Sequence, residues 1–274
     1  MIVYIFLFIF GLLVGSFLSV IIYRETKGSD NKSKSFFPSW IAGRSYCDHC
    51  HKKIVWYDNI PLLSYIILKG KCRYCGEKID RSYPLFELFV ALEFVWIYWL
   101  LGRFSFFTNM EGIFSVGVLI YWLFVFSIGL ALAVIDIKRQ ILPDSLIVTG
   151  VLISLFRLFF TGRWEFLISA LGLFGFYLVI YYASMLVYGK EGLGFGDVKL
   201  ALFVGLVLGW WQWVIMATII AFLTGSVVSV ILILSRKKKL KSSLAFGPFM
   251  LWGMVIAKIA GEFLWTWYGG MLGL

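Results

Sequence analysis

The chain has 274 residues, of which 61% are hydrophobic and only 15% are charged, and its mean hydropathy is +0.90. Charged residues normally coat a soluble domain, so this composition excludes a soluble protein of this size and indicates a polytopic membrane protein. A net charge of +10 could suggest nucleic acid as a partner, but the basic residues gather in a few loops, which is typical of membrane topology signals.

A transmembrane helix needs about 20 apolar residues, and eight runs of the chain come near that length. They are 1–23, 84–102, 113–135, 145–161, 166–188, 198–211, 213–235 and 244–268. The first run lacks a basic segment before it and a clean cleavage site after it, so it is a span and not a signal peptide. The run at 198–211 is short and poorly separated from the next one. We therefore predict an all-α polytopic membrane protein with about eight transmembrane helices.

The distribution of Lys and Arg predicts the orientation. If the N-terminus lies outside, the inner segments are 24–83, 136–144, 189–199 and 235–243, and these hold 21 of the 25 basic residues. The other four are Arg103, Arg157, Arg163 and Lys258. This asymmetry predicts that both termini lie outside and that four loops are cytoplasmic.

The segment 24–83, between the first two spans, is the only sizeable soluble piece, and it opens with a polar stretch at 26–35 that is typical of a flexible linker. All four cysteines of the chain follow, as two CxxC pairs with 21 residues between them. They are Cys47, Cys50, Cys72 and Cys75. Two such pairs indicate a tetrahedral zinc site, because each pair forms one half of the ligand shell.

Disulfides and free thiols are the alternatives to zinc, but disulfides rarely persist in the cytoplasm. His49 and His51 are alternative ligands, although four thiolates already complete the shell. A closed four-cysteine shell leaves no open catalytic position, so we expect a structural metal that supplies the core of a small cytoplasmic insert.

Two aspartates stand at the ends of apolar runs. Asp136 follows more than 20 apolar residues and precedes Lys138 and Arg139, whereas Asp197 begins the sixth run. Two crossings separate them, and an even number of crossings returns the chain to the same face. Both carboxylates are therefore expected at similar depth near the inner leaflet, where acids tend to be functional.

Two neighbouring carboxylates can share one proton, so that the ionised one deprotonates water while the protonated one polarises a peptide carbonyl. This is the chemistry of aspartyl proteolysis. Gly194 and Gly196 precede Asp197, and glycine allows positive φ and close approach of a substrate backbone. The alternatives are structural: Asp197 could cap its helix, and Asp136 could balance the positive charge of Lys138 and Arg139.

Several blocks of the sequence, in order along nearly the whole chain, resemble the type IV prepilin peptidase family of bacterial leader peptidases and N-methyltransferases. The blocks are "GLLVGSFLSVIIYR" (11–24), "RSYCDHC" (44–50), "NIPLLSYIILKGKCRYC" (59–75), "RSYPLFE" (81–87), "DIKRQILPD" (136–144) and "GLGFGDVKL" (192–200). In the first block the position of Ser19 is often Asn in that family.

The resemblance implies an enzyme of the bacterial cytoplasmic membrane that cleaves the basic leader of prepilins and pseudopilins on the cytoplasmic side, between Gly and a hydrophobic residue, often Phe. It also implies methylation of the new N-terminus with S-adenosylmethionine. By motif match, Asp136 and Asp197 are the catalytic aspartates, whereas we expect Asp144 to cap the fourth span. The expected parts are a first span (1–23), a zinc insert associated with methylation (24–83) and a peptidase domain (84–274).

Glu87 matches an acid common in that family and is a candidate for binding the cofactor, although an acid at a helix N-terminus is also favoured by the helix dipole. Lys258 and Glu262 are four residues apart and suit an ion pair on one helix face. The competing functions are a transporter with paired acids that bind a proton or cation, a membrane-anchored zinc module that only binds partners, and a peptidase without methyltransferase activity. A transporter should contain internal repeats with broken helices, and the sequence shows none.

Overall fold

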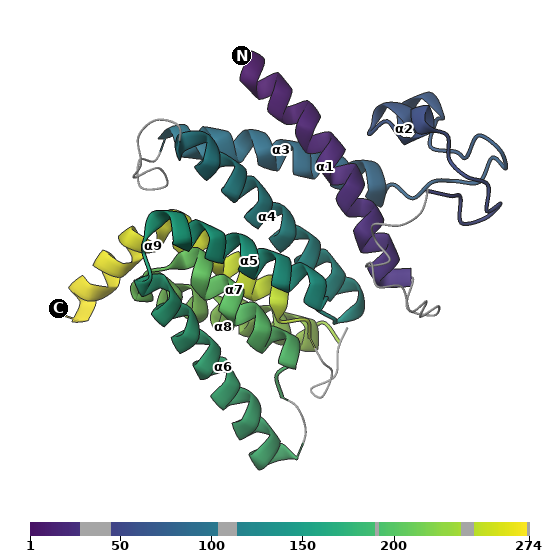
Figure 1. The fold of residues 1–274 in the computed structure, drawn as a ribbon. Helices are drawn as coiled ribbons and strands as arrows, with labels where there is room; N and C mark the ends of the chain where they lie inside the picture. Colours follow the sequence, from purple (N-terminus) through teal and green to yellow (C-terminus); the bar gives the residue numbers. More distant parts are fainter. Residues whose placement is uncertain (28–44, 104–113, 190–191, 237–243, 273–274) are drawn as a thin grey trace. The chain divides into compact units, whose positions relative to one another are not determined.

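The computed structural model describes residues 1–27, 45–103, 114–189, 192–236 and 244–272, and these are mainly helical (Figure 1). The long helices are α1 (Ile2–Lys27), α3 (Ser82–Arg103), α4 (Phe114–Arg139), α5 (Asp144–Thr161), α6 (Glu165–Tyr188), α7 (Phe195–Leu208), α8 (Trp211–Leu234) and α9 (Gly247–Leu272). Most of the predicted flexible stretch at 26–35 lies outside the described residues.

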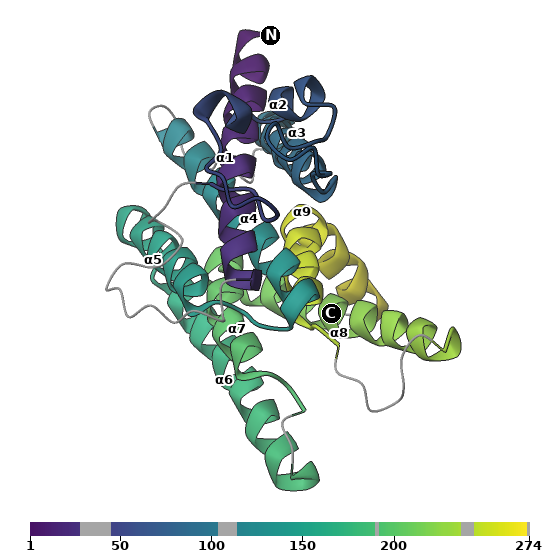
Figure 2. The ribbon, with the colours of Figure 1, turned by 90° about the vertical axis from the view of Figure 1, so that its right-hand side faces the viewer.

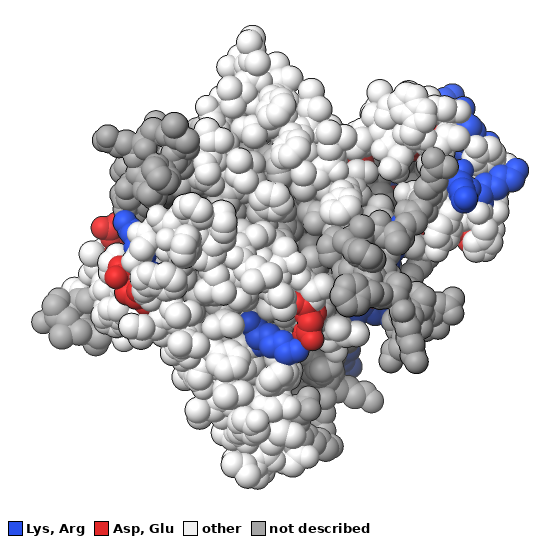
Figure 3. Space-filling view, in the orientation of Figure 1, with Lys and Arg blue, Asp and Glu red and all other residues white. Residues whose placement is uncertain are grey.

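Seven helices of the described residues are long and apolar enough to cross a membrane, namely all of the long helices except α7. Nearly all of the described surface in Figure 3 is uncharged, with acidic and basic groups confined to a few places. An apolar outer surface of this kind suits contact with lipid. The prediction of an all-α polytopic membrane protein is therefore confirmed.

The sixth expected span corresponds to α7, which has only 14 residues. At 1.5 Å per residue it is about 21 Å long, shorter than the roughly 30 Å hydrocarbon core of a bilayer. The helix is apolar because it is enclosed by protein. Residues around its whole circumference are buried, among them Leu200, Phe203 and Leu206. Hydropathy alone cannot separate a helix buried in protein from one that faces lipid.

The chain divides into two compact units, Met1–Ser127 and Ile128–Leu274, with the boundary inside α4. In the first unit α1 packs along α3, and the segment between them holds the single-turn helices η2 (Trp56–Asn59) and α2 (Leu63–Ile67). Two isolated antiparallel bridges, Tyr46 to Lys53 and Lys71 to Lys78, each close a short loop around one cysteine pair.

In the second unit α7 is the central helix and contacts α5, α6, α8 and α9 (Figure 1, Figure 2). The helix approaches α6 closely at Gly205, where a methyl group would lie 2.5 Å from the Cα atom of Ala170. Small residues at such contacts allow membrane helices to pack tightly through dispersion forces. Leu158 of α5, Phe166 and Ala170 of α6, and Leu206 of α7 form a buried cluster there.

Candidate active site and candidate zinc site

Asp136 lies in the last turn of α4 and Asp197 in the first turn of α7, and both are almost fully buried, with 4% and 8% of their surface exposed. They are close enough for their carboxylates to interact electrostatically. The prediction from an even number of crossings, that these two acids lie at the same end of the helices, agrees with this geometry. A buried carboxylate pair is costly unless its members share a proton or accept hydrogen bonds.

Asp136 is held by a residue that the sequence analysis did not single out. The backbone N–H of Gly247, the first residue of α9, donates a buried hydrogen bond of 3.0 Å to Oδ2 of Asp136. The N-terminus of a helix carries a partial positive charge, so this contact favours the ionised form of the carboxyl group. Pro248 at the next position is typical of a helix start, so the sequence indicates where α9 begins. Nothing in the sequence indicates that this helix start contacts Asp136.

Gly247 has no room for a side chain. A methyl group at that position would lie 2.7 Å from Oδ2 of Asp136 and 3.4 Å from Cδ2 of Leu142. Leu142 follows α4, is buried, and also contacts the second glycine of the site, since a methyl group on Gly196 would lie 3.2 Å from its Cβ atom. Leu142 therefore acts as a spacer between the first turns of α7 and α9.

The glycines before Asp197 serve close packing. Gly194 is the N-cap of α7 with φ of −69° and accepts a hydrogen bond of 3.0 Å from the backbone N–H of Asp197. Neither Gly194 nor Gly196 has positive φ, which differs from the reason that we expected for them. A methyl group on Gly194 would lie 3.3 Å from Oδ2 of Asp197, so these glycines keep the surroundings of the carboxylate free of side chains.

Neither Asp197 nor Asp144 occupies the N-cap position of its helix. Asp197 is not the N-cap of α7, because Gly194 holds that position, and the carboxylate of Asp197 instead reaches back to the backbone N–H of Gly194. Asp144 is likewise the first helical residue of α5, after an N-cap at Pro143, and the prediction that it caps this helix is wrong. Its exposed carboxylate forms a salt bridge of 2.7 Å with Lys199 of α7, with 68% of the side chain accessible. Asp136 and not Asp144 is the buried partner of Asp197.

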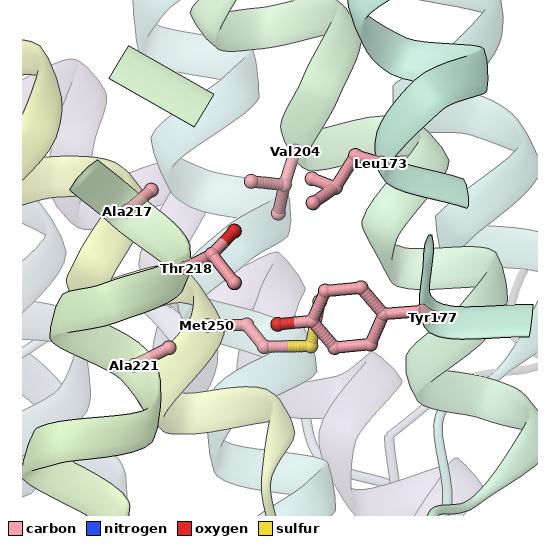
Figure 4. A pocket seen from close by; sticks show the side chains of 7 residues that line it. All are labelled: Leu173, Tyr177, Val204, Ala217, Thr218, Ala221 and Met250. Carbon is pink, nitrogen blue, oxygen red and sulfur yellow. The ribbon is translucent and has the colours of Figure 1, made fainter. Parts of the chain in front are cut away.

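Tyr177 of α6 is buried near Asp197 and near Thr218 of α8, and it was not predicted from the sequence. Its ring borders a small pocket (Figure 4) lined by Leu173, Tyr177, Val204, Ala217, Thr218, Ala221 and Met250. The free space of about 10 Å³ is close to that of one water molecule. This space is too small to hold a peptide.

The four cysteines form one cluster, and every pair of Sγ atoms lies within 4.8 Å. The Sγ atoms of Cys47 and Cys75 are 3.8 Å apart, and Zn–S bonds of about 2.3 Å in a tetrahedron give the same spacing. Each pair sits in a tight turn, in which the N–H groups of His51 and Gly76 donate to the carbonyls of Cys47 and Cys72. His51 and Gly76 both have positive φ, which such a turn requires.

The donor set fits zinc. Four sulfur ligands at tetrahedral spacing are what a structural zinc ion prefers. The backbone N–H of Cys75 helps to lower the pKa of the Cys72 thiol to about 7, so this ligand is readily available as a thiolate. Cys47, Cys50, Cys72 and Cys75 would hold the ion, and it would supply a fixed crosslink in place of a hydrophobic core.

The cysteine segment is anchored to the first unit through Glu87 of α3. Oε2 of Glu87 accepts a hydrogen bond of 2.9 Å from the backbone N–H of Leu62, which has a strained φ of 57°. The side chain of Ser16 of α1 also hydrogen-bonds to Glu87, and Tyr23 of α1 donates to Asp48 next to the first cysteine pair. These contacts give Glu87 a positioning role, and its proposed role in cofactor binding stays a prediction.

The fold and the site together define a polytopic membrane protein with a pair of buried aspartates at the ends of two helices and a four-cysteine cluster in the segment between α1 and α3. Residues 9–101 match the bacterial peptidase A24 N-terminal domain, and residues 118–230 match the type IV leader peptidase family. The chain belongs to the type IV leader peptidase family.

Curated relatives named prepilin leader peptidase/N-methyltransferase align over most of both chains. The protein of Stutzerimonas stutzeri is 30% identical over 275 residues, which cover 93% of this chain and 89% of the relative. That of Pseudomonas aeruginosa is 32% identical over 92% of this chain and 88% of its own length. That of Dickeya chrysanthemi is 34% identical over 89% and 88%, respectively. No solved structure matches the chain.

Proposed function

We propose that the chain is a membrane-embedded aspartyl endopeptidase that removes the leader of type IV prepilins or pseudopilins and methylates the new N-terminus. The buried pair of Asp136 and Asp197 carries the peptidase part of this proposal. The names of the relatives support the substrate and the second activity. The cleavage after a Gly and before a residue such as Phe follows the family resemblance.

The hydrogen bond from Gly247 suggests which aspartate carries the proton. Because the helix start of α9 stabilises negative charge on Asp136, the shared proton resides on Asp197. Asp136 then takes a proton from a water molecule while the water oxygen attacks the carbonyl carbon of the peptide bond. At the same time Asp197 donates its proton to the carbonyl oxygen. When the C–N bond breaks, the proton held by Asp136 passes to the leaving nitrogen, and Asp197 recovers its own from the collapsing intermediate.

Gly194 and Gly196 are proposed to position the substrate, since they leave space for its backbone beside Asp197. The surface around Asp144 and Lys199 lies next to the first turn of α7 and is exposed, so an extended peptide can approach from there. The four-cysteine insert, with structural zinc, belongs to the methyltransferase part in this proposal, and S-adenosylmethionine is the methyl donor by resemblance. The N-terminus lies outside and the aspartates face the cytoplasm, as the distribution of basic residues indicates.

The test is cleavage of a prepilin peptide by purified Asp136→Asn and Asp197→Asn enzymes. Asn keeps the shape of the side chain but cannot exchange the proton, so each variant should lose cleavage while its insertion and melting stay close to wild type. The double variant should be scarcely worse than either single one, because the pair acts as a unit. Asp144→Asn is the matched control and should be mild, since an exposed salt bridge contributes about 1 kcal/mol at most. Near wild-type cleavage by either folded variant would remove the peptidase assignment.

A further inference from the structure

The short helix α2, in the segment that carries the cysteines, turns its apolar face outward. Leu63, Ile66 and Ile67 stand at positions i, i+3 and i+4, so they share one face of this single turn, and more than half of the surface of each is exposed. The other face points into the segment, since Tyr65 is half-buried and a methyl group on Gly70 would lie 2.8 Å from its Oη atom. A helix on a soluble surface has the reverse arrangement, with its apolar face turned inward.

Two further apolar side chains extend this face. Ile60 precedes Leu63 by three residues, and Trp56 belongs to η2, which packs against α2. Both are exposed, Trp56 to 78% of its surface. Together they form the α2 patch, which consists of Trp56, Ile60, Leu63, Ile66 and Ile67. Single exposed apolar residues are common on soluble surfaces, but a patch of neighbouring ones indicates a surface that something apolar covers.

A hydrogen bond places α2 at the level of a membrane span. The backbone N–H of Leu62, the N-cap of α2, donates to Oε2 of Glu87 in α3 at 2.9 Å. The candidate span of α3 starts at Ser82, so Glu87 lies roughly 8 Å inside that span at the helical rise. The helix α2 therefore begins beside the first two turns of a span, where the hydrocarbon core meets the lipid headgroups.

The packing of α1 on α3 gives the same level independently. The two helices are antiparallel, since a methyl group on Gly11 would lie 2.6 Å from the Cα atom of Ala91 and one on Gly15 would lie 2.9 Å from that of Glu87. Gly15 is near the middle of the candidate span Ile2–Thr26, which continues for roughly 17 Å beyond it. The contact between Glu87 and α2 is therefore within the depth of both spans.

The cysteines lie nearer to the end of α1 than α2 does. Tyr23, eight residues beyond Gly15, donates a hydrogen bond to Asp48, which stands between Cys47 and Cys50. Eight residues correspond to roughly 12 Å along the helix. The α2 patch is thus on the membrane side of this segment, and the cysteine cluster is on the side toward the water.

The charges beside the patch indicate an anionic surface as its partner. The stretch from Ile60 to Lys71 contains no acidic residue, and its two charged residues, Lys69 and Lys71, directly follow α2 and are exposed. Around α2 the surface in Figure 3 is uncharged, with basic groups beside it. Apolar side chains with tryptophan and flanking lysines are typical of segments that lie in the membrane interface, with ammonium groups at the level of the phosphates.

We propose that the α2 patch inserts into the interface of the bilayer, in the leaflet where α3 begins, and that Lys69 and Lys71 contact the phosphates of anionic lipids there. This contact holds the cysteine segment at a fixed height against the membrane. The other occupants of the patch, namely the second unit of this chain or another protein, are outcomes of the test below. The surface is separate from the peptidase chemistry and does not depend on the proposed function.

The test is photo-crosslinking of the full-length protein in nanodiscs of phosphatidylglycerol. Benzoylphenylalanine in place of Ile66 should form adducts with lipid, which mass spectrometry identifies, and Ile67 is the second position if that protein does not fold. Benzoylphenylalanine in place of Tyr46 is the matched control, because this exposed aromatic residue is next to the first cysteine pair, and it should form at least tenfold fewer lipid adducts. Adducts of position 66 with protein only, or lipid adducts no more frequent than at position 46, would overturn the proposal.

A pair of lysine substitutions tests the contact with phosphate. Phosphatidylglycerol should give about threefold more lipid adducts at position 66 than phosphatidylcholine with the same acyl chains, and Lys69→Gln/Lys71→Gln should abolish this difference. The matched control is Lys52→Gln/Lys53→Gln, an exposed lysine pair beside the first cysteine pair, which should keep the difference. Equal adduct yields from the two lipids before any lysine is replaced would overturn the role of Lys69 and Lys71.

Discussion

Replacing Gly247 by alanine tests whether the start of α9 positions the proposed catalytic pair. The new methyl group would lie 2.7 Å from Oδ2 of Asp136, whereas carbon–oxygen contacts are normally several tenths of an ångström longer. The carboxylate must therefore retreat by roughly 0.5 Å and loosen its hydrogen bond to the Gly247 N–H. Since a misplacement of about 1 Å can cost 10²-fold in rate, we expect kcat to fall about 10- to 100-fold, or about 1.4 to 2.7 kcal/mol of activation free energy.

The assay is cleavage of a prepilin peptide in detergent or nanodiscs, with kcat and KM measured separately over a range of pH. KM should change little, because the substrate does not need Asp136 to bind. The acidic limb of the pH profile should move to higher pH, since a weaker hydrogen bond stabilises the carboxylate less. Stability should not fall through helix propensity, because alanine is the better helix former by about 1 kcal/mol.

Gly172→Ala in α6 is the matched control, since a methyl group there meets no other atom within 4 Å. It should leave kcat and the pH profile unchanged. A Gly247→Ala enzyme with wild-type kcat and an unshifted acidic limb would show that the contact between α9 and Asp136 has no role in catalysis.

Three further predictions concern the cysteine segment and its anchor. Purified protein should contain about one zinc per chain, which Cys47→Ser/Cys50→Ser should lose in elemental analysis, and a metal-free but ordered segment would contradict the site. Glu87→Gln should weaken the contact to Leu62 by about 1 kcal/mol, because it removes the charge from the acceptor, and amide exchange near residue 62 should accelerate, whereas the exposed Glu77→Gln should have no effect. Arg73 lowers the pKa of Asp58 through their paired hydrogen bonds, so this contact should stabilise the segment above the ordinary aspartate pKa of about 4 and lose its effect as the pH falls below that. The stability difference between wild type and Asp58→Asn should therefore be constant near neutral pH and shrink in acid, and a difference independent of pH would contradict this.

The local chemistry of this chain was largely predictable, because it depends on features close together in the sequence. Hydropathy located the seven helices that are long enough to span a membrane, and the spacing of the cysteines indicated their cluster. The shared face of Asp136 and Asp197 followed from counting crossings, which needs no knowledge of packing. The length of α7 could not be predicted in the same way, since a buried helix and a lipid-facing helix have the same composition.

The contacts that complete the site were not predictable, because they join residues far apart in the chain. Gly247 stands 111 positions after the carboxylate that it binds. Leu142 is an ordinary apolar residue by its type, and only the fold places it against Gly196 and Gly247. Tyr177 belongs to a helix whose apolar residues show no preferred face toward Asp197. Each of these contacts is a consequence of helix packing, which a single sequence does not specify.

The short length of α7 bears on how the proposed site could be reached from water. A helix of about 21 Å cannot reach both surfaces of a hydrocarbon core of roughly 30 Å. Its far end meets the tryptophans at Trp210 and Trp211, and its near end carries Asp197 one turn from the exposed pair of Lys199 and Asp144. The carboxylate is buried in the bundle, whereas accessible polar groups lie in the same turn of α7. Lengthening α7 by a helical turn before Asp197 would move the carboxylate away from Asp136 and Gly247. The length of α7 therefore helps to set the position of the Asp197 carboxylate.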